Sequence, residues 1–174
     1  MPLFTVGHSN RLLEELVLLL RENGVSQLFD VRTLPRSRHN PQFNSDALAA
    51  ALPARGIAYA HRPALGGLRK PKHESVNQGW KEEGFRGYAD YMQTPEFGRA
   101  LRELMQEAER GSTAIMCAEA LPSHCHRSLI SDALSVRGVE VRHIIGAGEI
   151  RLHVLTGFAE VEGHRIIYPF ALEG

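Results

Sequence analysis

Residues 3–31 read LFTVGHSNRLLEELVLLLRENGVSQLFDV, and their hydrophobic pattern predicts a strand, a helix and a second strand. The first strand is the apolar run Leu3-Phe4-Thr5-Val6. Ser9 is expected to cap the helix, and Asn23-Gly24 is expected to end it. The second strand covers Gln27 to Arg32. The apolar face of the helix is expected to contain Leu12, Leu13, Leu16, Leu19 and Leu20.

The rest of the chain repeats this alternation. Ser45 is expected to cap a helix through Leu48 and Leu52 to Gly56, ahead of a third strand at 57–60. After an irregular stretch at 61–84, the expected elements are helices at 85–92 and 94–110, a strand at 113–116, a helix at 126–137, and strands at 139–145 and 166–168. Such alternation is typical of right-handed parallel crossovers. The sequence therefore predicts an α/β protein, a single domain over 1–174, with a mostly parallel open sheet of about five strands and helices on both faces.

The composition excludes a strong overall electrostatic field. Twenty Lys and Arg balance twenty Asp and Glu, and 43% of the 174 residues are hydrophobic, which is enough for a sizeable core. The charge is nevertheless uneven between residues 32 and 72, where one acidic residue, Asp46, stands among eight basic ones. These are Arg32, Arg36, Arg38, Arg55, Arg62, Arg69, Lys70 and Lys72. The stretch is either a patch that favours an anionic ligand or a solvated surface.

The sequence also bears on the cellular location. Two cysteines are too few for a disulfide framework of the secreted type. The first residues lack the charged and apolar regions of a signal peptide, and the apolar run Leu16–Leu20 is too short to cross a bilayer. We therefore expect a soluble, cytoplasmic protein with reduced thiols and no membrane partner.

Unusual polar residues follow four of the expected strands. They lie at 7–10, 30–38, 61–69 and 117–127. In an open parallel sheet, the loops that follow the strands meet at the carboxyl edge, where ligands bind. The segment 117–127 contains both cysteines and precedes a helix N-terminus, which favours anions. One binding pocket at this edge is therefore predicted.

The spaced motifs resemble one family. They are Gly7-His8-Ser9-Asn10, Asp30-Val31-Arg32 with Pro35, Ser37-Arg38, Pro41 and Phe43-Asn44, then Leu65-Gly66-Gly67 and Arg69, then Cys117 with Glu119, and Cys125-His126-Arg127. In this order they resemble the domain of unknown function family 488, from about the first strand to Ile145. The resemblance supports the α/β fold and the position of the site, and it implies no particular reaction.

The two cysteines are the candidate nucleophiles. Cys125 is expected at or just before the first turn of a helix, where the dipole and Arg127 lower a thiol pKa. Cys117 is expected at the end of a buried strand. For either residue, the alternative is a small buried apolar side chain.

Other polar residues complete the candidate site. Glu119 and Asp30 are candidate general acids or bases, or else fixed partners for an arginine. Ser9 is either an anion ligand or, more simply, the helix cap. The candidate anion ligands among the arginines, whose guanidinium groups suit bidentate binding of phosphate or carboxylate, are Arg32, Arg38, Arg69 and Arg127. Gly7, Gly66 and Gly67 are expected to allow turns or close backbone approaches.

Several familiar templates are absent. The sixth residue after each cysteine is a serine, Ser123 or Ser131, so the phosphatase loop with its arginine is excluded. Cys117 is followed by Pro122 in a segment longer than the compact thiol loop of rhodanese-like proteins. The chain has no Cys-x-x-Cys and neither of the glycine-rich nucleotide motifs. His124, Cys125 and His126 alternate like metal ligands, but adjacent side chains rarely point together, so neither a metal nor another cofactor is expected.

Three functions remain open from the sequence. The first is an enzyme that binds a phosphorylated small molecule or nucleic acid through the arginines, with Cys125 or Cys117 as nucleophile and Glu119 or Asp30 moving protons. The second is a non-catalytic nucleic-acid-binding module that uses the basic stretch 32–72. The third is a redox protein in which the two cysteines form a reversible disulfide.

Overall fold

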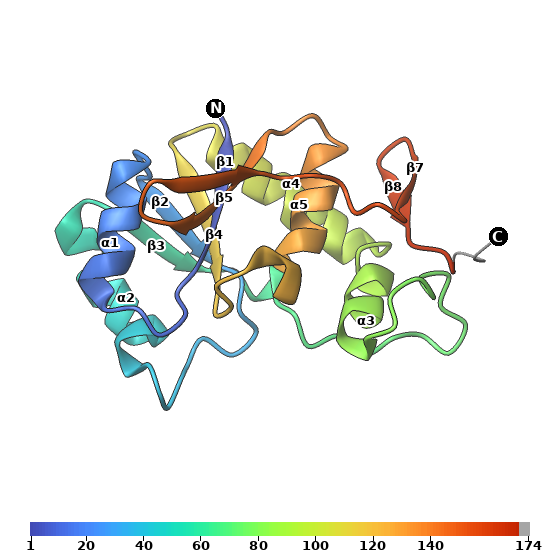
Figure 1. Ribbon diagram of the computed structural model, residues 1–174, viewed down its shortest axis with the longest axis horizontal. Coiled ribbons are helices and arrows are strands. Elements are labelled where there is room, and N and C mark those ends of the chain that lie inside the picture. Colours follow the sequence, from blue (N-terminus) through green and yellow to red (C-terminus); the bar gives the residue numbers. More distant parts are fainter. Residues whose placement is uncertain (171–174) are drawn as a thin grey trace.

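The computed structural model describes residues 1–170 and confirms the α/β class. Its main sheet has six strands in the order β3-β2-β4-β1-β5-β6 (Figure 1). The strands are β1 (Leu3–Gly7), β2 (Gln27–Asp30), β3 (Ala58–His61), β4 (Thr113–Cys117), β5 (Val141–Gly146) and β6 (Glu149–Leu152). The first five pair parallel, and β6 pairs antiparallel with β5 at one edge. The expected five-stranded parallel sheet is thus present, with one further strand added.

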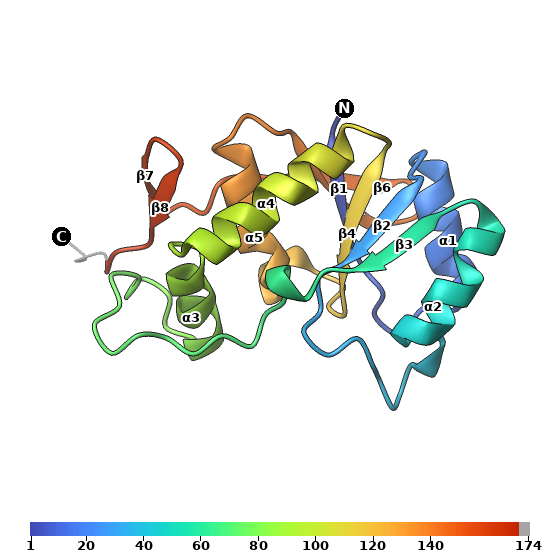
Figure 2. The same cartoon turned by 180° about the vertical axis from the view of Figure 1, so that it is seen from behind.

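The described residues form five helices, and four of them cover the two faces of this sheet, as predicted. The five helices are α1 (Leu13–Glu22), α2 (Ser45–Ala51), α3 (Glu83–Tyr91), α4 (Pro95–Ala108) and α5 (Arg127–Ser135). From behind, α4 runs diagonally across the back of the sheet, while α1 and α2 lie at the far end (Figure 2). Short 3-10 turns lie at η1 (Pro41–Phe43), η2 (Pro53–Arg55), η3 (Pro63–Leu65) and η4 (Pro122–His124).

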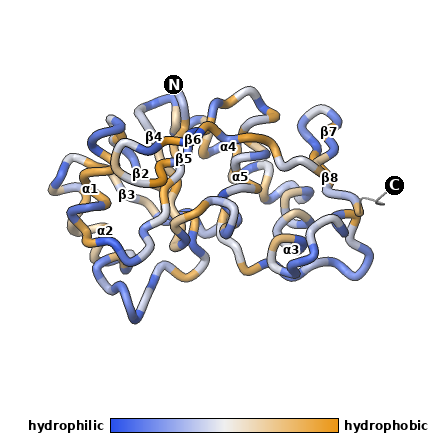
Figure 3. The backbone as a smooth tube through the Cα atoms, viewed as in Figure 1, coloured by the Kyte–Doolittle hydropathy of each residue, from blue (hydrophilic) through white to orange (hydrophobic). Residues whose placement is uncertain are grey.

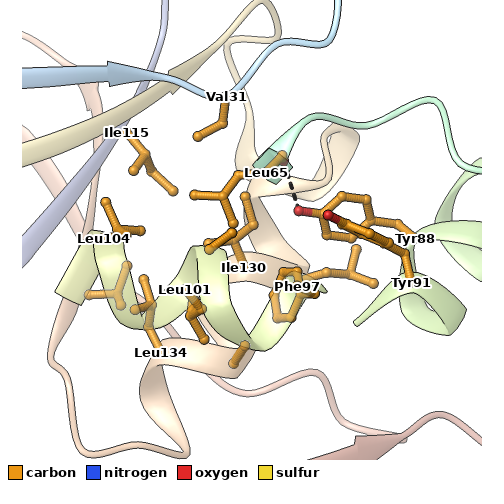
Figure 4. Close-up of a cluster of buried hydrophobic side chains, with 14 of the residues drawn as sticks. Val31, Leu65, Tyr88, Tyr91, Phe97, Leu101, Leu104, Ile115, Ile130 and Leu134 are labelled. Carbon is orange, nitrogen blue, oxygen red and sulfur yellow. Dashed lines mark hydrogen bonds between the residues drawn. The ribbon is translucent and has the colours of Figure 1, made fainter. Parts of the chain in front are cut away.

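Strand β4 shows why the sheet needs helices on both sides. All of its residues are buried, and they alternate between two separate cores. Ala114 and Met116 pack in the core under α1 and α2, while Ile115 and Cys117 pack in the core under α4 and α5. The second core is drawn in Figure 4, where Tyr88 also donates a hydrogen bond of 2.8 Å to the Leu65 carbonyl. Hydrophilic segments are concentrated in the outlying loops (Figure 3).

The start of α1 differs from the prediction. The N-cap is Leu12, and its backbone N–H donates to the Glu15 carboxylate at 3.3 Å. Ser9 instead has a φ of +49°, and its N–H donates to the Ala118 carbonyl at 2.9 Å. Because Ser9 belongs to a turn tied to the loop after β4, it cannot cap the helix. Leu12 is consequently 67% exposed and does not belong to the apolar face.

Most other boundaries agree with the prediction. The Thr94 hydroxyl accepts the Phe97 N–H at 3.3 Å and caps α4 as expected. Helix α2 is capped at Asn44, one residue before the predicted cap. The predicted tail strand is matched by β8 (Arg165–Ile167), which pairs with β7 (Glu160–Glu162) in a separate hairpin. Within residues 1–170, no helix is both long and apolar enough to cross a membrane.

Candidate thiol site at the carboxyl edge of the sheet

A pocket of about 780 Å³ lies at the carboxyl ends of the parallel strands. The loop after β1 contributes His8 to Asn10, and the loop after β2 contributes residues between Arg32 and Asn40. Gly67 and Leu68 come from the segment after β3, and residues between Cys117 and His126 come from the segment after β4. The four loops that the sequence singled out therefore do meet at one edge of the sheet.

The two cysteines form a disulfide at the wall of this pocket. Cys117 is the last residue of β4, and Cys125 lies two residues before α5. Their Cα atoms are 7.3 Å apart. Both side chains line the pocket although only 2% of Cys117 and 6% of Cys125 are exposed. The bond closes the segment Ala118–His124 into a loop.

His126 connects Cys125 to the end of β2. Its Nε2 atom lies 2.7 Å from the Val31 carbonyl oxygen, and its Nδ1 atom lies 3.5 Å from the Cys125 Sγ atom. A carbonyl can only accept, so Nε2 carries the ring proton and Nδ1 presents its lone pair to the sulfur. Burial lowers the pKa of His126 to about 4, so the ring is neutral at pH 7. His126 can therefore accept a hydrogen bond from the thiol of reduced Cys125.

The start of α5 provides a favourable contact for a thiolate at Cys125. The backbone N–H of Arg127 points at the Cys125 Sγ atom, 3.4 Å away. This N–H belongs to the first turn of the helix, where unpaired donors and the helix dipole attract negative charge. The predicted placement of Cys125 just before the helix is confirmed, and Cys117 does end a buried strand.

Asp30 is a fixed partner in a buried polar network. It is fully buried and accepts hydrogen bonds from Arg32 Nε at 2.8 Å and Nη2 at 2.6 Å, and from the Tyr59 hydroxyl at 2.6 Å. Arg32 also contacts His8 Nε2 at 3.2 Å, and burial lowers the pKa of His8. Of the two roles considered for Asp30, the geometry favours the arginine partner, since the carboxylate is enclosed and does not line the pocket.

Two residues of the pocket have unfavourable backbone conformations. Ser9 and Leu68 have φ values of +49° and +59°, and they are the non-glycine residues with positive φ in the part of the chain that the structure describes. Both line the pocket. A positive φ is a steric outlier for a side chain such as that of Leu68, and backbone strain of this kind clusters at functional sites.

The predicted glycines permit close packing around the same pocket. A Cβ atom on Gly7 would overlap the Glu119 carbonyl group, and one on Gly66 would overlap the Thr33 side chain. A Cβ atom on Gly67 would lie 3.1 Å from His126 Nδ1. The expectation of close approaches is therefore confirmed at these positions, and none of the three requires a positive φ.

The pocket brings together part of the predicted site. Of the nine predicted residues it is lined by Ser9, Arg32, Cys117, Glu119 and Cys125, and the four that do not line it are Asp30, Arg38, Arg69 and Arg127. The expectation that all of the arginines line one pocket is therefore wrong. Arg69 stacks on the Tyr91 ring, 3.7 Å from its centroid, and donates to the Gly66 carbonyl at 3.2 Å. Arg38 is exposed, and Arg127 is fully buried. The roles of these residues in binding stay predictions.

Several residues of the pocket have no role that the sequence predicts. They are His8, Asn10, His124 and His126, of which His126 has the clearest chemical position. In the sequence, His126 directly follows the candidate nucleophile Cys125, and this proximity could have indicated a role. The pattern His124-Cys125-His126 predicts only a possible metal motif. Among residues 1–170, the structure contains no group of three or more His, Cys, Asp or Glu side chains placed to hold a metal ion.

The fold and the site define an α/β protein with a cysteine pair in the pocket at the carboxyl edge of its parallel strands. The chain belongs to the family described as domain of unknown function DUF488, whose model matches residues 12–134. This range is shorter than the resemblance noted in the sequence, since it begins after the Gly7–Asn10 segment. Searches of curated proteins and of solved structures each returned no match.

Proposed function

We propose that the protein is a thiol–disulfide redox enzyme whose reactive centre is the Cys117–Cys125 pair. The observation that carries this proposal is the bond between the two sulfurs at the wall of a strand-exit pocket. In the cytoplasm, which we propose as the location, disulfides are usually transient and belong to catalytic or redox-sensing sites. Both cysteines line this pocket, so a substrate held there would lie next to the bond.

The reaction is an exchange between this dithiol and a substrate disulfide. The Cys125 thiolate attacks one substrate sulfur, forms a mixed disulfide and releases the other substrate sulfur as a thiolate. The Cys117 thiolate then attacks the Cys125 sulfur and displaces the second substrate thiolate. The protein loses two electrons and two protons as its disulfide forms, and the substrate disulfide gains them as two thiols. The reverse sequence oxidises a substrate dithiol.

The contacts of the two cysteines support different roles for them. Cys125 is contacted by the first N–H of α5, which favours loss of the thiol proton, and by His126 Nδ1, which can accept a hydrogen bond from the thiol. Cys117 has neither contact, and its Sγ atom lies 3.8 Å from the Glu119 carbonyl oxygen, which disfavours a negative charge. We therefore assign Cys125 as the attacking thiol and Cys117 as the resolving thiol.

The other two functions have weaker support in the geometry. A nucleic-acid module would need the basic stretch 32–72 to be free, but several of its cations are engaged within the protein. Arg32 pairs with Asp30 and Arg55 pairs with Glu14. Arg62 pairs with Glu107 at 2.6 Å, and Arg69 stacks on Tyr91. The phosphorylated ligand is compatible with the redox function, because a substrate that reacts with the thiols can also carry a phosphate group.

The proposal is tested by trapping the mixed disulfide. Reduced wild-type protein and the variants Cys117→Ser and Cys125→Ser are each incubated with glutathione disulfide and examined by intact mass spectrometry. The wild type is expected to lose the mass of two hydrogens. The Cys117→Ser variant should retain one glutathione, because the resolving thiol is missing, and Cys125→Ser should react far more slowly. A wild type that stays reduced, or equal labelling of both variants, would overturn the proposal.

A further inference from the structure

The buried guanidinium of Arg127 is not explained by the thiol chemistry. Its side chain is fully buried, and its Nε and Nη1 atoms have no hydrogen-bond partner among the described residues. The remaining nitrogen, Nη2, donates to the Ala120 carbonyl at 3.3 Å. A buried charged group with unmet donors is costly, and proteins retain such groups where another state or a ligand satisfies them.

The surroundings of Arg127 contain no fixed counter-ion. Burial lowers the pKa of Arg127 to about 9. The negative charge of Glu119 raises this pKa and the positive charge of Arg11 lowers it, so both charges are within electrostatic range. Neither forms a salt bridge with Arg127 in the part of the chain that the structure describes, since Glu119 is exposed and lines the pocket. Arg11 itself donates to the Ile145 carbonyl at 2.8 Å. Two cations thus lie near one another.

The covering segment is the loop that the disulfide closes. Arg127 Nη2 bonds to Ala120, which lies within Ala118–His124, and both ends of that segment are held by the Cys117–Cys125 bond. Most of the segment is exposed on its outer side. Reduction removes the covalent link between the two ends of the segment and leaves the backbone contact from Ser9 N–H to the Ala118 carbonyl. The segment then has freedom to move away from the guanidinium.

We infer that Arg127 is an anion-binding residue that becomes accessible to the pocket when the Cys117–Cys125 disulfide is reduced. The ligand is a small oxyanion, a phosphate or carboxylate group on the substrate, for which the planar guanidinium offers the unpaired Nε and Nη1 donors. This inference rests on the proposed redox function and deepens it. It makes anion binding a property of the dithiol state, and by thermodynamic linkage a bound anion favours that state in return.

The inference is tested with inorganic phosphate and acetate as probes. Calorimetric titration of the reduced full chain should give a dissociation constant at least about ten-fold lower than that of the oxidised chain, within the usual range of coupling between two sites. Phosphate and acetate are titrated separately, so that the tighter ligand identifies the group recognised. The double variant Cys117→Ser/Cys125→Ser should bind like the reduced protein without any reductant.

The variant Arg127→Met separates this site from the rest of the pocket. An apolar side chain of similar length removes the unmet donors, so the ligand-free melting temperature should stay unchanged or rise. Binding of the probe should be lost. The matched control is Arg99→Met, which removes an exposed guanidinium on α4 outside the pocket and should leave the binding by reduced protein unchanged.

The possible failures are distinguishable. Equal affinity of the oxidised and reduced forms, no binding to either, or unchanged binding by Arg127→Met would each overturn the inference. If the wild type forms no disulfide, the redox function fails. The double serine variant still reports on the anion site in that case, because its binding depends on Arg127 and not on redox chemistry.

Discussion

The Nδ1 atom of His126 lies 3.5 Å from the Sγ atom of Cys125 while its Nε2 atom is held 2.7 Å from the Val31 carbonyl oxygen. The carbonyl comes from the residue that follows β2, and Cys125 comes from the segment that follows β4. The relationship therefore joins two neighbouring strands of the sheet through one imidazole ring. It fixes both the ring orientation and the tautomer that the thiol meets.

Replacing this ring should change the titration of Cys125. In the reduced protein, His126→Asn removes the Nδ1 acceptor of the thiol proton, so the alkylation rate of Cys125 at pH 7 should rise by up to about ten-fold, which corresponds to the loss of one hydrogen bond. The pH at which alkylation reaches half its maximum should fall at the same time. The matched control is His124→Asn, which changes an exposed histidine of the same pocket and should leave the profile unchanged. Identical profiles for both variants would count against a role for His126.

Cys125 should react before Cys117 in the reduced protein. The first N–H of α5 faces Cys125, whereas Cys117 ends a buried strand. Limiting alkylation at neutral pH followed by peptide mass mapping should label Cys125 first. Added salt should reduce the preference only modestly, because a dipole acting over one turn in a partly buried site is weakly screened. First labelling of Cys117 would reverse the assignment of the two thiols.

Acid should destabilise the fold partly through His126. Its pKa is about 4 in the folded chain, against 6.5 when unperturbed, so below pH 6.5 the unfolded chain binds a proton that the folded chain does not. Its contribution to stability is therefore complete above pH 6.5 and declines as the pH falls towards 4. Between pH 7 and pH 5, the free energy of unfolding measured in urea should fall by about 2 kcal/mol more for the wild type than for His126→Gln. Equal losses in the two proteins would show that His126 is not the responsible group.

The glycine at the end of β1 should not tolerate a side chain. Gly7→Ala places a Cβ atom onto the Glu119 carbonyl, so the free energy of unfolding should fall by about 1–3 kcal/mol relative to the wild type. The control is Gly84→Ala in α3, where a Cβ atom meets nothing within 4 Å and helix propensity improves. The melting temperature should therefore fall for Gly7→Ala and rise for Gly84→Ala. A neutral Gly7→Ala would mean that the loop after β4 yields easily at this point.

Two buried tyrosines should differ in what their hydroxyl groups contribute. Tyr168 donates to the buried Asp132 carboxylate at 2.7 Å, whereas Tyr91 donates to the neutral Ala64 carbonyl at 2.6 Å. Bonds to charged groups contribute about 1.5–3 kcal/mol, and neutral ones about 0.5–1.5 kcal/mol. Urea unfolding should thus show a larger loss for Tyr168→Phe than for Tyr91→Phe. The reverse order would indicate that His153 and Thr156, which also contact Asp132, satisfy it alone.

Much of the architecture could be predicted because it depends on local patterns. The alternation of apolar strands with amphipathic helices is present in the sequence, and it determined the five parallel strands and the helices on both faces. Strand β6 was missed because Ile150 and Leu152 remain exposed at a sheet edge, so burial leaves no periodic signal there. The cap of α1 was misplaced since Ser9 is committed to a contact with Ala118, far away in the sequence.

The sequence by itself determined the class of fold, the edge of the sheet where the polar loops meet, and the candidate thiols, since parallel topology sends all strand exits to one side. Only the tertiary structure decided which side chains face the pocket. It enclosed Asp30 with Arg32, buried Arg127 and placed Arg69 on Tyr91, and it brought Cys117, Cys125 and His126 together. The physical reason is that a side chain's direction and partners depend on contacts between segments distant in the chain, which residue type and spacing do not encode.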